Sequence, residues 1–195
     1  NFDFFDLDVG GRLESVNLKN TSMEKGFFPA AFSSTIKREI LTNNNLFGGF
    51  DFTQRAPNAV ELFANGPHHA QEQFEVGDST MSVETSYNFS LGYSYNDGLD
   101  TLKIETYYNY IDDFIAADRD GTTTVVEGED MNNVNFSQYN ALFTGLEVSG
   151  QYALARIDDF DIISNFMMDF LKGYRTSNDK ALSRIPQTKM NFGIQ

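Results

Sequence analysis

Apolar and polar residues alternate with a period of two along several stretches of this chain, and this pattern constrains its fold more than any other feature. Between residues 86 and 95, one face holds apolar side chains and the other holds small polar groups: Tyr87, Phe89, Leu91, Tyr93 and Tyr95 against Ser86, Asn88, Ser90, Gly92 and Ser94. Such alternation is typical of β-strands that separate two environments. A stretch of about 9–11 residues is also long enough for a tilted strand to cross a bilayer.

The same alternation recurs along the chain. It is clear in residues 7–14, 101–110 and 146–152, and weaker in residues 28–37, 46–55, 160–170 and 189–195. We therefore expect about eight antiparallel strands. Charged residues that fall on the polar faces are candidates to line a substrate path or to hydrate a barrel interior: Asp6, Asp8, Arg12, Glu14, Asp51, Arg55, Lys103, Glu105 and Glu147.

Short and long connections between these stretches follow one another in strict alternation. The short ones are residues 42–45, 96–100 and 156–159, and the long ones are residues 17–26, 56–84, 116–140 and 171–184. Outer-membrane barrels place short turns at the periplasmic end and long loops outside. The rhythm predicts Asn43, Asp97 and Asp158 at one end of the strands, and His68, Gly121 and Ser177 at the other. A soluble β-sandwich binding module remains the alternative.

Composition narrows the function classes. No stretch approaches the about 18 apolar residues that a membrane-spanning helix requires. The chain has 9 Tyr and 19 Phe, no Cys, and a net charge of −14, which leaves no basic surface for nucleic acid. Asn1 is not followed by an export leader, so we expect that a leader was removed or that the chain starts within a longer protein.

One segment carries a family resemblance. Residues 54–84 contain Arg55-Ala56-Pro57, Glu61-Leu62-Phe63, Gly77-Asp78 and Glu84-Thr85-Ser86 in this order. This arrangement resembles the signature extracellular loop of TonB-dependent receptors, so Arg55, Pro57, Glu61, Gly77 and Glu84 are the candidate motif residues. Residues 106–115, residues 141–152 and Arg184-Ile185-Pro186 are similar to other family segments. The chain departs from the pattern at Thr144, where Tyr is usual, and at Gln71-Glu72.

The resemblance implies an all-β fold, with residues 1–195 as part of a transmembrane barrel of about 22 strands. It implies a plug domain and a TonB-contacting segment outside this chain, outer-membrane lipid around the wall, and long loops facing outward from a Gram-negative cell. Such a receptor imports a scarce nutrient and performs no covalent chemistry. A small closed barrel of eight strands, the smallest class of outer-membrane barrel, is the other reading of the strand count.

The two histidines of the chain are adjacent, at His68 and His69, with Glu61, Glu72 and Asp78 nearby in sequence. Imidazole and carboxylate together suit Zn²⁺. The motif Asn65-Gly66-Pro67-His68 also resembles receptors associated with zinc uptake. Haem or an iron chelate is the competing ligand. Adjacent side chains on an extended backbone point apart, so a shared site needs a bend. The Ser-His-Asp order that an enzyme site requires is missing from the sequence.

Overall fold

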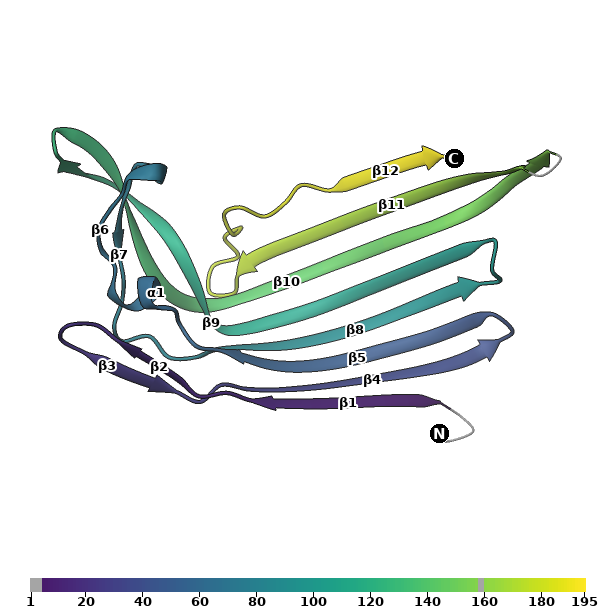
Figure 1. Ribbon diagram of the computed structural model, residues 1–195, viewed down its shortest axis with the longest axis horizontal. Helices are drawn as coiled ribbons and strands as arrows, with labels where there is room; N and C mark the ends of the chain where they lie inside the picture. The colour runs from purple at the N-terminus through teal and green to yellow at the C-terminus, as the bar shows by residue number, and fades with distance from the viewer. Residues whose placement is uncertain (1–4, 158–159) are drawn as a thin grey trace.

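The computed structural model describes residues 5–157 and 160–195, and most of them lie in β-strands (Figure 1). The elements in chain order are β1 (Asp6–Leu13), β2 (Val16–Lys19), β3 (Glu24–Phe27), β4 (Ala30–Leu41), β5 (Asn44–Arg55), α1 (Ala59–Phe63), β6 (Asn65–His68), η1 (His69–Gln71), β7 (Gln73–Val76), β8 (Glu84–Asn96), β9 (Thr101–Val126), β10 (Glu129–Ile157), β11 (Phe160–Arg175) and β12 (Lys189–Ile194). Neither helix in this part of the chain is long and apolar enough to cross a membrane.

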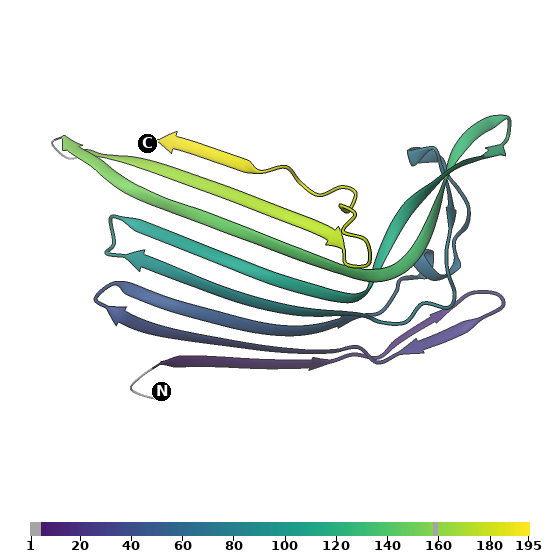
Figure 2. The same ribbon diagram turned by 180° about the vertical axis from the view of Figure 1, so that it is seen from behind.

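Eight strands form one antiparallel wall in the order β1-β4-β5-β8-β9-β10-β11-β12 (Figure 2). Each strand pairs with its neighbour along the chain once the loop strands are set aside, as hairpin connections favour. In the described residues no pairing joins β1 to β12. The arrangement is a curved section of barrel wall, neither a closed eight-stranded barrel nor two packed sheets.

Period-two alternation separates the faces of this wall as predicted. On one face, the Asn88 amide donates to Asp51 at 3.1 Å, and the Ser86 hydroxyl donates to Asn109 at 2.7 Å. The opposite face carries a band of aromatic contacts, with 4.9 Å between the Phe50 and Phe89 ring centroids. Within the described residues no second layer covers these apolar side chains, and Phe89 and Leu91 are more than half exposed. We call their face the outer face and the polar one the inner face.

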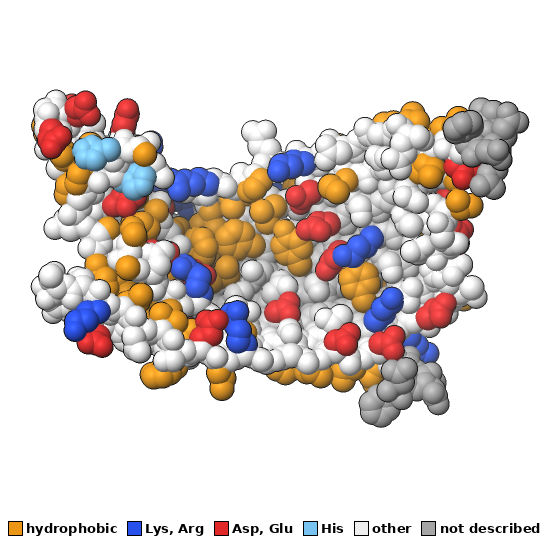
Figure 3. All heavy atoms as spheres, viewed as in Figure 1, with side chains coloured by type: hydrophobic (Ala, Val, Ile, Leu, Met, Phe, Trp, Pro, Cys, Tyr) orange, Lys and Arg blue, Asp and Glu red, His pale blue; other side chains and the backbone are white. Residues whose placement is uncertain are grey.

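Cross-strand register places the predicted inward charges together. Asp6 pairs with Lys37, and Ser33 pairs with both Gly10 and Asp51. Because directly paired residues share a face, the polar positions of β1 continue the inner face of β4 and β5. Asp51, Glu105 and Glu147 line one hollow of that face. Figure 3 shows charged side chains spread across the wall.

The short turns gather at one end of the wall and the long connections at the other, as the alternation of connection lengths predicts (Figure 1). Asn43 and Asp97 lie in turns at the end where Asn44 pairs with Tyr95 and Asn96 with Thr101. His68 and Ser177 come after the opposite ends of β5 and β11, and Gly121 lies in the part of β9 that continues beyond its pairing with β8. Asp158 lies outside the described residues.

Residues 116–140 do not form the long irregular connection that the sequence predicts. Strand β9 runs on to Val126 and β10 starts at Glu129, so only Glu127 and Gly128 turn the chain, with φ of 53° and 90°. Two positive φ values fit a tight hairpin turn. The hairpin extends beyond the wall, and β7 joins β10 there in parallel. The connection at residues 17–26 is likewise mostly a hairpin, of β2 with β3.

The separation of faces leads to a first prediction. Leu91 is 62% exposed on the outer face, and Ser90 beside it belongs to the inner face. Leu91→Arg in the full-length protein should lower the free energy of unfolding by about 2–4 kcal/mol if this face meets the hydrocarbon of a membrane. Ser90→Arg should change it by only about 0.5 kcal/mol. Urea unfolding in lipid vesicles measures both, and equal losses would contradict this assignment of faces.

Candidate functional site

The loop of residues 56–83 begins with a short capped helix. The Asn58 side chain accepts hydrogen bonds from the backbone N–H groups of Val60 and Glu61 at 2.8 and 2.9 Å. In return, Glu61 Oε2 accepts the Asn58 N–H at 2.7 Å, which completes a capping box around α1. Pro57, directly before the cap, is fully buried. Because an isolated helix of this length is not stable in water, these local bonds and its packing must hold it.

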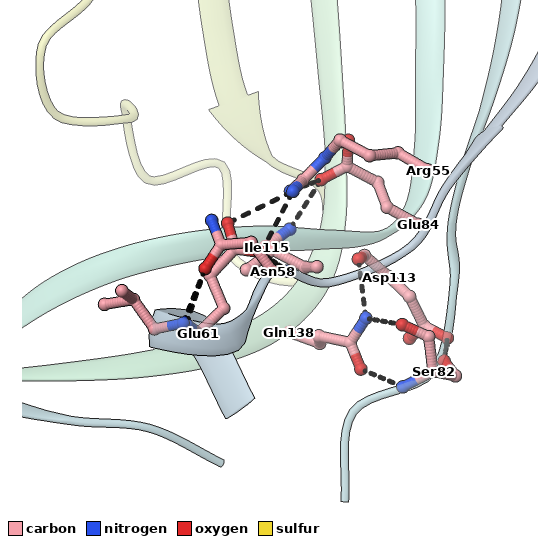
Figure 4. A network of polar contacts seen from close by, with 9 residues as sticks. Arg55, Asn58, Glu61, Ser82, Glu84, Asp113, Ile115 and Gln138 are labelled. Atoms are coloured by element: carbon pink, nitrogen blue, oxygen red, sulfur yellow. Dashed lines mark hydrogen bonds and ion pairs between the residues drawn. The ribbon is translucent and has the colours of Figure 1, made fainter. Parts of the chain in front are cut away.

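Arg55, the last residue of β5, holds two of the predicted motif residues at once (Figure 4). Its Nη1 donates to both carboxylate oxygens of Glu61 at 3.1 and 3.0 Å. Its Nε and Nη2 donate to the two oxygens of Glu84 at 3.2 and 3.1 Å. The second contact is bidentate, the strongest geometry for a guanidinium and a carboxylate.

Glu84 extends the network from the loop into the wall. Its Oε2 also accepts the backbone N–H of Ile115 at 2.8 Å. The side chains of Glu61 and Glu84 are 11% and 13% exposed, against 42% for Arg55. Two nearly buried carboxylates therefore depend on one cation, and through it α1 is tied to β5, β8 and β9. The sequence motif groups Arg55, Glu61 and Glu84 in one segment, but it does not predict that one guanidinium contacts both carboxylates.

A second network closes the other end of the loop. The Gln138 amide accepts the Ser82 N–H at 3.0 Å and donates to the Ser82 carbonyl at 3.0 Å and the Asp113 carbonyl at 3.0 Å. The Ser82 hydroxyl also donates to Asp113 at 2.7 Å. These three residues could not be identified from the sequence, because they are common polar residues from three distant segments. The loop is thus fixed to the wall at both ends.

An apolar cluster fills the space between the loop and the wall. Leu62 from α1 and Met81 from the loop are 2% and 3% exposed, and both pack with Ile115 of β9. Full burial of one such side chain stabilises a fold by about 1.5–3 kcal/mol. The loop is accordingly a packed part of the structure, on which more exposed residues are displayed.

Gly77 lies where the chain returns past α1. Its N–H donates to the Ala64 carbonyl at 2.8 Å, and the next N–H, of Asp78, donates to the Glu61 carbonyl at 2.9 Å. A Cβ on Gly77 would come within 2.8 Å of the backbone of Leu62, Phe63 and Ala64. The glycine of the motif is therefore required for this close approach of two backbone segments.

The five predicted metal ligands fall into two separate groups. His68, His69 and Glu72 are exposed at the tip of the β6–β7 hairpin, where His68 pairs with Gln73. Figure 3 shows both imidazoles at the surface. Glu61 and Asp78 are at the base of the hairpin, about 10 Å away at the rise of a strand. Across the described residues, no group of three or more His, Cys, Asp or Glu side chains is placed to hold a metal ion.

The two carboxylates at the base already have partners. Glu61 binds Arg55, as described above. The hydroxyl and backbone N–H of Thr80 donate to Asp78 Oδ1 at 2.6 and 2.8 Å, and these bonds lower the pKa of Asp78 below its ordinary value. Asp78 keeps its negative charge but is turned toward its own loop. The structure thus leaves the tip residues as the accessible part of the predicted set.

The family described as "TonB dependent receptor-like, beta-barrel" matches residues 1–195. The wall and its loop are those of an outer-membrane receptor barrel, and the chain belongs to this family. The structure titled "Copper transporter OprC" superposes with a TM-score of 0.78 at 18% identity, covering 100% of this chain and 30% of that one. The siderophore receptor PirA from Pseudomonas aeruginosa gives 0.51 at 14% identity, covering 99% and 47%. The chain spans less than half of either.

The Arg55 contacts lead to a second prediction. Arg55→Gln in the full-length receptor should leave Glu61 and Glu84 without their cation and cost about 2 kcal/mol in local stability. Amide hydrogens of α1 and of Gly77 should then exchange about 30-fold faster, which hydrogen–deuterium exchange measures. The matched control is Arg12→Gln, because Arg12 is 61% exposed and its contact with Glu14 contributes little. Unchanged exchange at α1 in the Arg55 variant would contradict this role.

Close packing at Gly77 leads to a third prediction. Gly77→Ala should force the loop backbone away from α1 and expose the loop to limited proteolysis, since backbone cannot yield as a flexible side chain can. Gly66→Ala in the same loop is the control, because a Cβ there meets nothing within 4 Å. Cleavage within residues 56–83 should increase for the first variant only. Equal cleavage of both would mean that Gly77 is not held against the helix.

Proposed function

We propose that the whole receptor imports a scarce metal nutrient across the Gram-negative outer membrane, with residues 1–195 as part of its wall and its ligand-facing loops. The observation that carries this proposal is the single sheet with an unpartnered apolar face, a charged inner face and all long loops at one end. The apolar face suits lipid, and the inner face suits a water-filled lumen that holds a plug domain. TonB would supply force through a part of the receptor outside these residues.

The solved neighbours do not identify the cargo of this receptor. One solved neighbour is named a copper transporter and the other a siderophore receptor. At 18% and 14% identity they support the shared fold and leave the ligand open. A metal-related cargo would be compatible with both names, and the proposal rests on residues of this chain. Transport in this class needs no covalent step.

Zinc is the specific cargo that we propose for the hairpin tip. His68, His69 and Glu72 are exposed there, and Glu72 has a left-handed backbone with φ of 51°, so the chain bends sharply beside the imidazoles. Such a bend can turn neighbouring side chains toward one ion, which an extended strand does not. Zn²⁺ prefers about four ligands of this type. The remaining ligands would come from the plug or from other loops of the receptor.

Growth assays test the transport proposal. A strain lacking the receptor gene should grow poorly when zinc is limiting and recover with the wild-type gene. Growth on haem as the iron source, measured in parallel, separates the two import readings. If deletion leaves growth unchanged under every metal and haem limitation tested, the import proposal is wrong.

A fourth prediction concerns the imidazoles themselves. His68→Ala/His69→Ala in the full-length receptor should weaken Zn²⁺ binding by about 10–100-fold, the range seen when residues supporting a metal site are lost. Calorimetric titration with Zn²⁺ measures the affinity. The control is Gln71→Ala, which alters the same exposed turn without removing an imidazole or a carboxylate. An unchanged affinity in the double variant would exclude the hairpin tip as the zinc site.

A further inference from the structure

Basic side chains concentrate in one pocket at the long-loop end of the wall. The pocket is lined by four cations, Arg119, Arg175, Lys180 and Arg184, and by a single carboxylate, Asp118. The whole chain carries a net charge of −14, with only 14 Lys and Arg in total. The net charge of this pocket is therefore opposite in sign to that of the whole chain. Bringing like charges together costs electrostatic energy.

Arg175, at the end of β11, is held in a fixed position. Its Nη2 donates to Asp118 Oδ2 at 2.9 Å, and its guanidinium lies over the Tyr139 ring at 3.5 Å from the centroid. The side chain is 29% exposed. One carboxylate and one aromatic face thus orient the guanidinium while leaving part of it open. A pre-oriented guanidinium loses little conformational entropy when it binds a ligand.

The loop after β11 folds back to complete the pocket. Arg175 N–H donates to the Lys180 carbonyl at 2.8 Å, and Leu182 N–H donates to the Gly173 carbonyl at 3.0 Å. These backbone bonds fix residues 180–182 beside the strand that carries Arg175. The position of the cations is therefore set by backbone geometry, although the side chains of Lys180 and Arg184 are exposed.

Three of the four cations form no salt bridge with a carboxylate of the described residues. Within the described residues, neither Arg119 nor Lys180 nor Arg184 forms a salt bridge, and Asp118 is already engaged by Arg175. The nearby Asp120 is occupied by Thr122 and Asn135. Among the residues that line the pocket, the formal excess is therefore three positive charges.

Register places this pocket on the inner face. Arg175 pairs with Ala141, and Asp169 on the same strand pairs with Glu147, so an even spacing puts Arg175 and Asp169 on one face. Glu147 lines the inner hollow described above. A ligand in the pocket would thus be reached from the mouth of the lumen and not from the lipid side.

We propose that this pocket is an oxyanion site, which binds a small soluble ligand through carboxylate or phosphate groups. Guanidinium and ammonium groups converging on one space are the usual means of binding such groups. The proposal rests on the proposed function in one respect, since it takes the inner face as the lumen. It then specifies the cargo further: a metal entering this way would be carried by an anionic chelator, because a bare cation would be repelled.

Calorimetry on the full-length receptor in detergent tests the proposal with three probes, namely citrate, citrate with equimolar Zn²⁺, and inorganic phosphate. Arg119→Gln/Arg184→Gln removes two cations that hold no salt bridge, so folding should be unaffected. We expect the variant to bind citrate at least about tenfold more weakly than wild type. Lys180→Gln, a single change in the folded-back loop, should weaken binding in the same direction. Tighter binding of the zinc complex than of citrate would indicate a chelate site, and equal binding of phosphate a general oxyanion site.

The matched control is Lys37→Gln/Lys189→Gln, which removes two exposed inner-face charges outside the pocket. It should leave citrate affinity within about twofold of wild type, because distant exposed charges are screened by salt. An equal loss in the control would overturn the proposal, as would failure of the wild type to bind any probe. Uptake measured separately distinguishes the two hypotheses. Zinc uptake without anion binding contradicts only this site, and anion binding without uptake contradicts only the transport proposal.

Discussion

Hydrogen bonding of the backbone is the constraint on which the rest of this structure depends. The outer face exposes Phe89 and Leu91 at 53% and 62%, so it is built to meet hydrocarbon, where no water can satisfy a free N–H or C=O group. Every wall strand must therefore pair on both sides. The unbroken order from β1 to β12 achieves this for the inner six, and the two edge strands require partners from elsewhere in a complete barrel. The loops and their polar networks are attached to these hydrogen-bonded strands.

Much of this wall could be predicted from the sequence because its two sides meet different solvents. Alternation is strict where one face meets lipid, as at Tyr87 and Asn88, and it disappears beyond the membrane, where both faces are wet. Residues 116–140 lack alternation for that reason, so the sequence predicts a loop there, although β9 and β10 continue through them. The β-branched run ending at Val126, followed by Glu127-Gly128, was the available signal for a hairpin.

The residues of the loop site could be predicted from the sequence, but the contacts between them could not. The family motif identified Arg55, Glu61 and Glu84, yet only the fold shows that one guanidinium holds both carboxylates. Proximity in sequence was misleading for the metal set, since an antiparallel hairpin carries His68 to its tip and leaves Glu61 at its base. Residues close in sequence share a site when the chain turns back on itself, and they are separated when it runs straight between them.

The charge of the inner face changes along the wall, and this bears on how a ligand could be captured and released. Glu105, Glu147 and Asp169 are direct neighbours across three strands. Two cations partly offset this negative charge: Lys103, at 2.6 Å from Glu105, and Lys189, which pairs with Asp169. The basic pocket lies farther toward the long loops. If an anionic ligand binds in that pocket, the acidic wall beneath opposes its further movement, as like charges in a confined lumen are weakly screened. Capture at the mouth would then be favourable without help, while passage inward would require work. This division fits a receptor that binds its cargo passively and spends energy only on transport.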